Sequence, residues 1–363
     1  MQFSLRSGIA LLLLIWFGAN LTAHGQATNP VYVDKQGVLR WQKGNAEANF
    51  FGVNYTVPFA YGYRSHKALG IDPEKAIDQD VYHMARLSFN AFRVHVWDTE
   101  ISDSLGNLLE NEHLRLFDYL ISKLKERNIK VLITPIAFWG PGYPEPDYKT
   151  GGFSSIYNKQ QAVTEEAAFK AQERYLKQFF QHVNPYTKTS YQDDPDVIAA
   201  EVNNEPHHTG PKERATEYIN RMVKAIRGTG WTKPIFYNIS ESPRYADAVA
   251  KANIDGVSFQ WYPTGLVANR TLQGNYLPMW TGIASHSTPY LPLLAKPAWS
   301  TSSTQEISPL QPCTRRWPAA LGMRDFSGPR SSPTTPWQQL MPTPSTRHTT
   351  SIWPIPPKKP SVC

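Results

Sequence analysis

Short apolar runs alternate with amphipathic segments through most of this 363-residue chain, and no other feature constrains its fold as strongly. Each apolar run is short enough for one buried strand. The segments between the runs carry apolar residues at helical spacing, and strands that alternate with helices form parallel βα units. The expected strands are 50–55, 91–97, 129–136, 197–202, 234–239 and 256–262.

Helix boundaries are marked by capping residues. Asp72 followed by Pro73 is a strong helix start, because Asp caps the first turn and Pro suits its first position. Gly228 and Gly230 stand where helices commonly end. The expected helices are 72–87, 111–125, 164–183, 212–227 and 243–252, and a short β-hairpin is expected at 32–42.

The strand at 197–202 is followed directly by Asn203, Asn204, Glu205 and Pro206. A carboxylate just past the C-terminal end of a buried parallel strand lies on the face where barrel enzymes carry their catalytic groups. A lone Glu is usually a solvated loop residue. Its place directly after a buried strand favours a catalytic Glu205.

This stretch resembles the fourth-strand motif of glycoside hydrolase family 5, the cellulase and endo-β-mannanase family, and the resemblance extends over roughly residues 32–277. It implies a (β/α)8 TIM barrel. It also implies that Glu205 is the general acid/base and that Asn204 hydrogen-bonds the sugar 2-hydroxyl.

The two ends of the chain differ from this body. Residues 1–27 combine a basic start, an apolar run and small residues, which is typical of a secretory signal peptide. We therefore expect a secreted or periplasmic protein whose mature chain has no membrane span. Residues 28–278 form the expected barrel, and residues 279–363 form a tail rich in Pro, Ser and Thr.

The net charge of +7 comes almost entirely from the tail. After residue 278 there are eight Lys or Arg and two Asp or Glu, so the body is close to neutral. A neutral body does not favour a nucleic-acid partner. Both cysteines, Cys313 and Cys363, also lie in the tail, so we expect no disulfide in the body.

The tail has two explanations. Its composition fits a low-complexity linker or stalk. It also fits out-of-frame translation, because codons for residues 296–304 can be read in another frame as Ala-Arg-Met-Val-Tyr-Glu-Phe-Asp, which resembles the family's seventh strand with its nucleophile. Residues 326–335 can similarly yield a word that resembles the eighth strand. We favour the out-of-frame origin.

That origin would leave an incomplete barrel of about six βα units with the tail outside the sheet. Two unpaired edges, at 50–55 and 256–262, would then favour aggregation and poor solubility. A compact tail that supplies two further parallel strands would overturn this interpretation.

Retaining glycoside hydrolysis needs two carboxyls about 5–5.5 Å apart. Glu205 supplies one, and no residue of this chain matches the family's nucleophile, so we expect an inactive product. Arg93 matches the family arginine that braces the nucleophile. His95, two residues further along the strand, faces the same way and could line the pocket, although a hydrogen-bonded core histidine is equally compatible.

The remaining candidates are expected to contact substrate. Tyr262 matches a family tyrosine that touches the nucleophile, whereas Gln260 replaces the usual histidine. Trp139, in an aromatic loop beyond the third strand, is expected to stack on a sugar ring. For four other loop aromatics, stacking and packing stay open: Tyr143, Tyr148, Phe153 and Tyr157.

His207 and His208 are too few to predict a metal site, and contact with substrate is the better reading. No cofactor is expected. The predicted function is an exported retaining endo-glycosidase that acts on a β-1,4-linked polysaccharide, mannan ahead of glucan. The alternative is a non-catalytic carbohydrate-binding barrel.

Overall fold

The computed structural model describes residues 29–55, 59–60, 62–137, 149–239, 243–259, 298–300 and 322–325, with the backbone alone at 243, 259, 298–300 and 322–325. The predicted signal peptide, residues 1–27, lies outside the described residues. Among the residues described, no helix is both long and apolar enough to cross a membrane.

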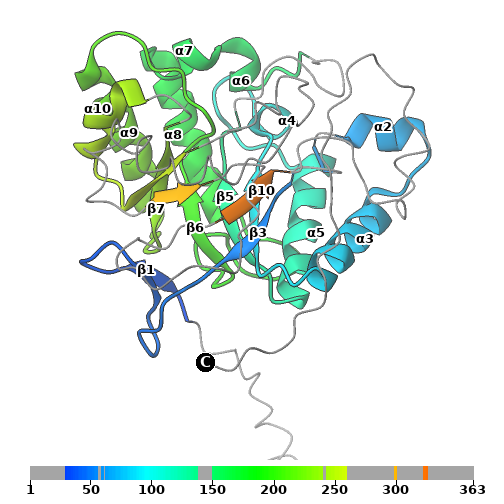
Figure 1. Ribbon diagram of the computed structural model, residues 1–363. Coiled ribbons are helices and arrows are strands. Elements are labelled where there is room, and N and C mark those ends of the chain that lie inside the picture. The colour runs from blue at the N-terminus through cyan, green and yellow to red at the C-terminus, as the bar shows by residue number, and fades with distance from the viewer. Residues whose placement is uncertain are drawn as a thin grey trace, which may run out of the picture.

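Eight parallel strands form a closed barrel in the order β10-β3-β4-β5-β6-β7-β8-β9 (Figure 1). The (β/α)8 class that the family resemblance implied is therefore confirmed. The strands are β3 (Phe51–Asn54), β4 (Ala91–His95), β5 (Lys130–Thr134), β6 (Val197–Glu201), β7 (Ile235–Asn238), β8 (Gly256–Phe259), β9 (Ala298–Ser300) and β10 (Gly322–Asp325).

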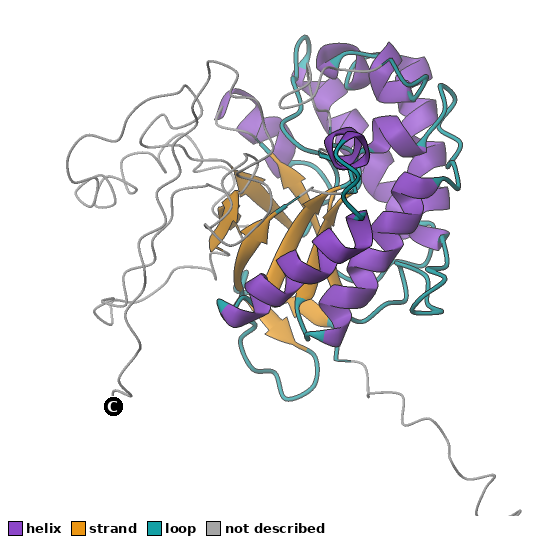
Figure 2. Cartoon of the chain, turned by 90° about the vertical axis from the view of Figure 1, so that its right-hand side faces the viewer, coloured by secondary structure: helices purple, strands orange, loops and turns teal. Residues whose placement is uncertain are grey.

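Helices connect β3 to β8 and lie together along one flank of the strands (Figure 2). The five predicted helices are present with ends shifted by at most three residues, and Asp72 caps its helix as expected by accepting a hydrogen bond from the Glu74 backbone N–H. Four short helices were not predicted. The helices are α2 (Tyr63–Ala68), α3 (Pro73–Arg86), α4 (Asp98–Ile101), α5 (Glu112–Glu126), α6 (Phe153–Ile156), α7 (Lys159–Ala162), α8 (Glu166–Gln181), α9 (Lys212–Arg227), the 3-10 turn η1 (Pro243–Tyr245) and α10 (Ala246–Ala250).

Strands β3 to β8, with the helices between them, are the six units expected of an incomplete barrel, and the tail supplies two further short strands. β10 pairs with β3 through four residues, β9 pairs with β8, and one residue pair joins β9 to β10. Backbone groups along the open edges of β3 and β8 must find partners, and any extended segment within reach can provide them. The predictions of a tail outside the sheet and of two exposed edges are therefore wrong. The two strands count against an out-of-frame origin, but the rest of the tail lies outside the described residues, so that origin stays a prediction.

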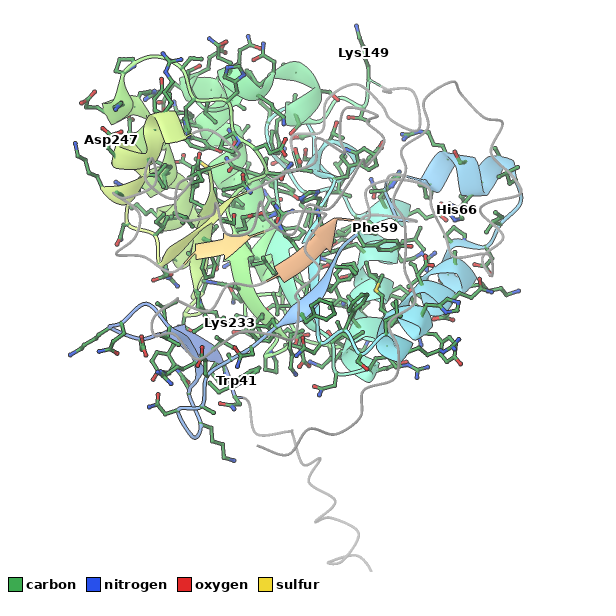
Figure 3. The ribbon with its side chains drawn as sticks, in the orientation of Figure 1. Trp41, Phe59, His66, Lys149, Lys233 and Asp247 are labelled. Atoms are coloured by element: carbon green, nitrogen blue, oxygen red, sulfur yellow. The ribbon has the colours of Figure 1, made fainter. Side chains whose placement is uncertain are left out.

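The antiparallel hairpin β1 (Val31–Val33) and β2 (Leu39–Trp41) closes the lower, N-terminal end of the barrel. Its Val31 and Leu39 pack in one apolar cluster with Leu132, Ile198 and Phe236 of the barrel strands. Trp41 of the hairpin and the buried Lys233, which precedes β7, lie at this same end (Figure 3). The opposite end of the barrel carries the C-terminal ends of the strands and the loops that follow them.

The barrel interior changes from apolar to polar along the strands. Side chains of a strand repeat on one face every two residues, so Thr134 stands one step above Leu132 and Asn238 one step above Phe236. The lower pair belongs to the apolar cluster, whereas the upper pair is buried and polar. We call the upper level the polar layer: Arg93, Thr134, Glu201, Asn238 and Ser258.

A β-bulge brings Glu201 into this layer. The β5–β6 register shifts after Val131, so that both Ile198 and Ala199 pack in the interior cluster while Val197 and Ala200 pack against the helices. A bulge adds one residue and reverses the alternation beyond it. Glu201, two residues after Ala199, therefore faces inward.

Candidate active site

Glu205 lies in the loop after β6, at the C-terminal end of the barrel. Its side chain is 35% exposed, and its carboxylate is 3.6 Å from the Lys159 ammonium on α7. Its backbone N–H donates to the Asn238 side-chain oxygen at 3.3 Å. The φ angle of Glu205 is 46°, which is unfavourable for a residue with a side chain and recurs at functional sites. The loop thus holds a reachable carboxylate in a strained backbone.

Asn204, the preceding residue, is buried and held on two sides. Its backbone N–H donates to the Ile136 carbonyl at 2.9 Å, which ties the loop to the end of β5. Its side-chain oxygen accepts from Arg93 Nη2 at 3.2 Å. Asn204 and Arg93, which the sequence predicted to share a site, are therefore in direct contact.

Arg93 and His95 project from β4 into the interior, and both are buried. Arg93 Nη1 contacts His95 Nε2, and since a guanidinium is only a donor, Nε2 must accept. Burial first, and then the nearby charges of Arg93 and Lys159, hold the pKa of His95 well below its usual value. His95 is thus a neutral acceptor.

Glu201 was missed in the sequence, where it was counted within an apolar run. It is fully buried, and its carboxylate accepts hydrogen bonds from four other strands. Arg93 Nε donates to Oε2 at 3.0 Å, as does Thr134 Oγ1 at 2.6 Å, and Arg93 Nη2 also contacts this oxygen. Asn238 Nδ2 donates to Oε1 at 3.2 Å, and Ser258 Oγ donates to the same oxygen. A carboxylate interrupting a buried strand was the available signal.

The contacts of Glu201 leave it unavailable as a nucleophile. A carboxylate offers about four acceptor positions, and five donor contacts occupy those of Glu201. Within the described side chains it is also the carboxylate that neutralises Arg93, the residue expected to brace the nucleophile.

Comparison with known proteins identifies the family. The model for cellulase (glycosyl hydrolase family 5) matches residues 43–273, more than half of the chain. The chain belongs to glycosyl hydrolase family 5. By family it is a glycoside hydrolase, as the motif around Glu205 predicted. No curated protein sequence matches it.

Solved structures agree with the family's barrel. The endo-1,4-β-mannanase from Rhizomucor miehei superposes with a TM-score of 0.55 at 17% identity, over 76% of this chain and 83% of that one. The exo-β-1,4-mannosidase from Opitutaceae bacterium strain TAV5 gives a TM-score of 0.57 at 17% identity, over 76% and 49% of the two chains. At such identity these likenesses show the shared fold.

The histidines next to Glu205 in this family 5 chain have different environments. His207 is exposed, whereas His208 is half-buried, and its Nε2 lies 2.5 Å from the Tyr237 hydroxyl. Its ring also packs near those of Tyr218 and Tyr245. Burial, and then the neighbouring His207, lower the pKa of His208 to about 4. His208 therefore anchors the loop, and contact of His207 with substrate stays a prediction.

Three predicted substrate contacts, Trp139, Gln260 and Tyr262, lie outside the described residues. Tyr143 and Tyr148, for which stacking and packing were both open, also lie outside them. The start of the aromatic loop is fixed by Asp98, whose carboxylate accepts from the Ala137 N–H at 2.7 Å.

The two described aromatics of this loop pack against the protein. Phe153 is fully buried, and Tyr157 is half-buried against the main core. Packing is therefore the role of Phe153. Among the described residues, no group of three or more His, Cys, Asp or Glu side chains is arranged to hold a metal ion.

Proposed function

We propose that the family 5 barrel is an exported retaining endo-glycosidase of β-1,4-linked polysaccharide, with β-mannan ahead of β-glucan. The observation that carries the proposal is the pair formed by Glu205 and Asn204 at the end of β6. One carboxylate is half-exposed, and the amide beside it is fixed by Arg93. A half-exposed carboxyl can exchange protons with substrate and water, as an acid/base must.

In the proposed reaction Glu205 first protonates the glycosidic oxygen. A nucleophilic carboxylate attacks the anomeric carbon and forms a glycosyl-enzyme, and Glu205 then deprotonates the water that releases the sugar. Asn204 would hydrogen-bond the 2-hydroxyl. No residue of this chain matches the family nucleophile, so we propose that the 363-residue product does not hydrolyse polysaccharide.

Activity assays on a frame-restored protein test this role of Glu205. Against a panel of mannans and glucans, Glu205→Gln should lose nearly all activity because the amide cannot transfer the proton. Glu110→Gln, a change at an exposed residue of the β4–α5 connection, should retain activity. Full activity of Glu205→Gln would refute the assignment, and activity of the 363-residue chain would refute its proposed inactivity.

The closed barrel favours a second candidate, a carbohydrate-binding barrel without catalysis. A chain selected for binding would keep an intact ring of strands, and β9 and β10 complete this ring. Gene sequencing around the Pro278 codon separates the two histories. An added or lost base supports the broken enzyme, whereas a clean frame in several isolates, with oligosaccharide binding but no hydrolysis, supports the binding protein.

Export follows from residues 1–27 in the same proposal. Expression of the chain with and without these residues, followed by fractionation, tests it. Export that persists without residues 1–27 would contradict it.

A further inference from the structure

Glu201 is connected to the candidate site by a short series of hydrogen bonds through Arg93. The Arg93 edge that carries Nε and Nη2 lies on Oε2 of Glu201. Nη2 also donates to Asn204, and Nη1 contacts His95. A guanidinium is planar and its donors have fixed directions. Whatever fixes this plane therefore also fixes the partners of Asn204 and His95.

The surroundings of Glu201 make it a rigid anchor. Its two oxygens accept from β4, β5, β7 and β8, so its position is set from several sides of the barrel. Charge-assisted hydrogen bonds are about twice as strong as neutral ones, and they strengthen further away from water. Arg93 has far less freedom than a guanidinium at the rim of a pocket.

We propose that Glu201 is a positioning residue of the candidate active site: it holds the Arg93 guanidinium in the plane that directs the Asn204 side-chain oxygen inward and its amide nitrogen the other way. The orientation of Arg93 and Asn204 at the strand ends then does not depend on a nucleophile. The sugar-binding part of this inference rests on the proposed function, whereas the part about Arg93 does not.

The orientation of Arg93 can be measured directly. In the full chain labelled with 15N-arginine, the Nε–H signal of Arg93, assigned by its loss in Arg93→Lys, should exchange slowly with water. Glu201→Gln should shift the signal and speed its exchange at least about tenfold, because the charged acceptor is lost. Glu110→Gln is the control: it neutralises an exposed carboxylate outside the polar layer, so the Arg93 signal should stay.

Glu201→Asp covers the case in which Glu201→Gln does not fold. It keeps the buried charge but shortens the side chain by one methylene, so the chain should fold while the Arg93 signal still shifts. A folded Glu201→Asp or Glu201→Gln protein with an unchanged Arg93 signal would overturn the proposal.

Oligosaccharide binding gives the second measurement. Mannohexaose and cellohexaose are titrated calorimetrically into the parent chain, Glu201→Asp and Glu110→Gln. We expect Glu201→Asp to weaken binding about tenfold and Glu110→Gln to leave it within about twofold. Equal affinity of Glu201→Asp and the parent chain would overturn the positioning role. A parent chain that binds neither sugar contradicts the proposed function, while the Arg93 signal still decides the role of Glu201.

Discussion

Two carboxylates four residues apart, Glu201 and Glu205, occupy opposite environments in this barrel. Glu201 lies in the polar layer, fully buried and bonded to four other strands. Glu205 lies in the loop that follows and is more than a third exposed. Among the described side chains, one cation lies near its carboxylate, at 3.6 Å. Glu201 is held by its hydrogen-bond partners, whereas Glu205 can exchange protons with solvent or substrate.

The difference shows that a residue within a strand and a residue at its end can have different roles in one site. A carboxylate saturated with donors orients its neighbours, because each hydrogen bond fixes the direction of one donor. A carboxylate at the strand end keeps access to solvent and substrate, which acid/base chemistry requires. The neighbouring bulge decides which of the two environments Glu201 enters.

The largest expected effect is on stability, and it tests the polar layer. Glu201→Leu should lower the free energy of unfolding by about 3–5 kcal/mol, because Arg93 is left with an uncompensated buried charge. Glu205→Gln should change it by no more than about 0.5 kcal/mol. Urea denaturation measures both. Adding Arg93→Met to Glu201→Leu should recover much of the loss, and similar values for the two Glu variants would remove the contrast.

The next effect concerns the loss of stability at acidic pH. The pKa of His208 is about 4 when folded and 6.5 in its ordinary state, so the unfolded chain binds more protons between these values. Stability from this ring is complete above pH 6.5 and is lost as pH falls towards 4, by about 2 kcal/mol for a half-buried group. Unfolding curves at several pH values should show a smaller acid loss in His208→Phe. His207→Gln removes only the smaller cause of the shift and should reduce the acid loss less than His208→Phe does. An identical pH profile for parent and His208→Phe would disprove the effect.

A smaller effect, a gain of stability, is expected from relieving the strained backbone at Glu205. Glu205→Gly should raise stability by about 0.5–1 kcal/mol, since glycine accepts a positive φ without steric cost. Glu217→Gly, within helix α9, should instead lower stability by about 1 kcal/mol. Thermal unfolding compares the two. A loss in both variants would mean that the Glu205 backbone stores no strain.

The smallest effect tests the ion pair at the strand end. Lys159→Met should alter stability by less than about 0.5 kcal/mol, because the pair is solvent-accessible and screened. Denaturation at low and high salt should give nearly equal differences between variant and parent. A loss above 1 kcal/mol would place Lys159 and Glu205 among the structural contacts and weaken the comparison.

Much of the barrel could be predicted because its signals are local. The capped start at Asp72 and the helical spacing of residues 111–125 fixed two helices to within one or two residues. The four short helices were missed because one turn carries too little periodicity to detect. The strands of the tail were missed for another reason: their few residues have no strand pattern of their own and become strands by pairing with β3 and β8.

The sequence by itself determined the family, the order of strands and helices and the place of Glu205 after β6, because apolar spacing and short motifs act along the chain. Tertiary structure alone decided that the barrel closes and that Glu201 faces its interior. Closure depends on backbone groups far apart in sequence, and the direction of Glu201 depends on a bulge between two strands. One added residue reverses the alternation of a strand, and the local sequence does not specify where that residue is accommodated.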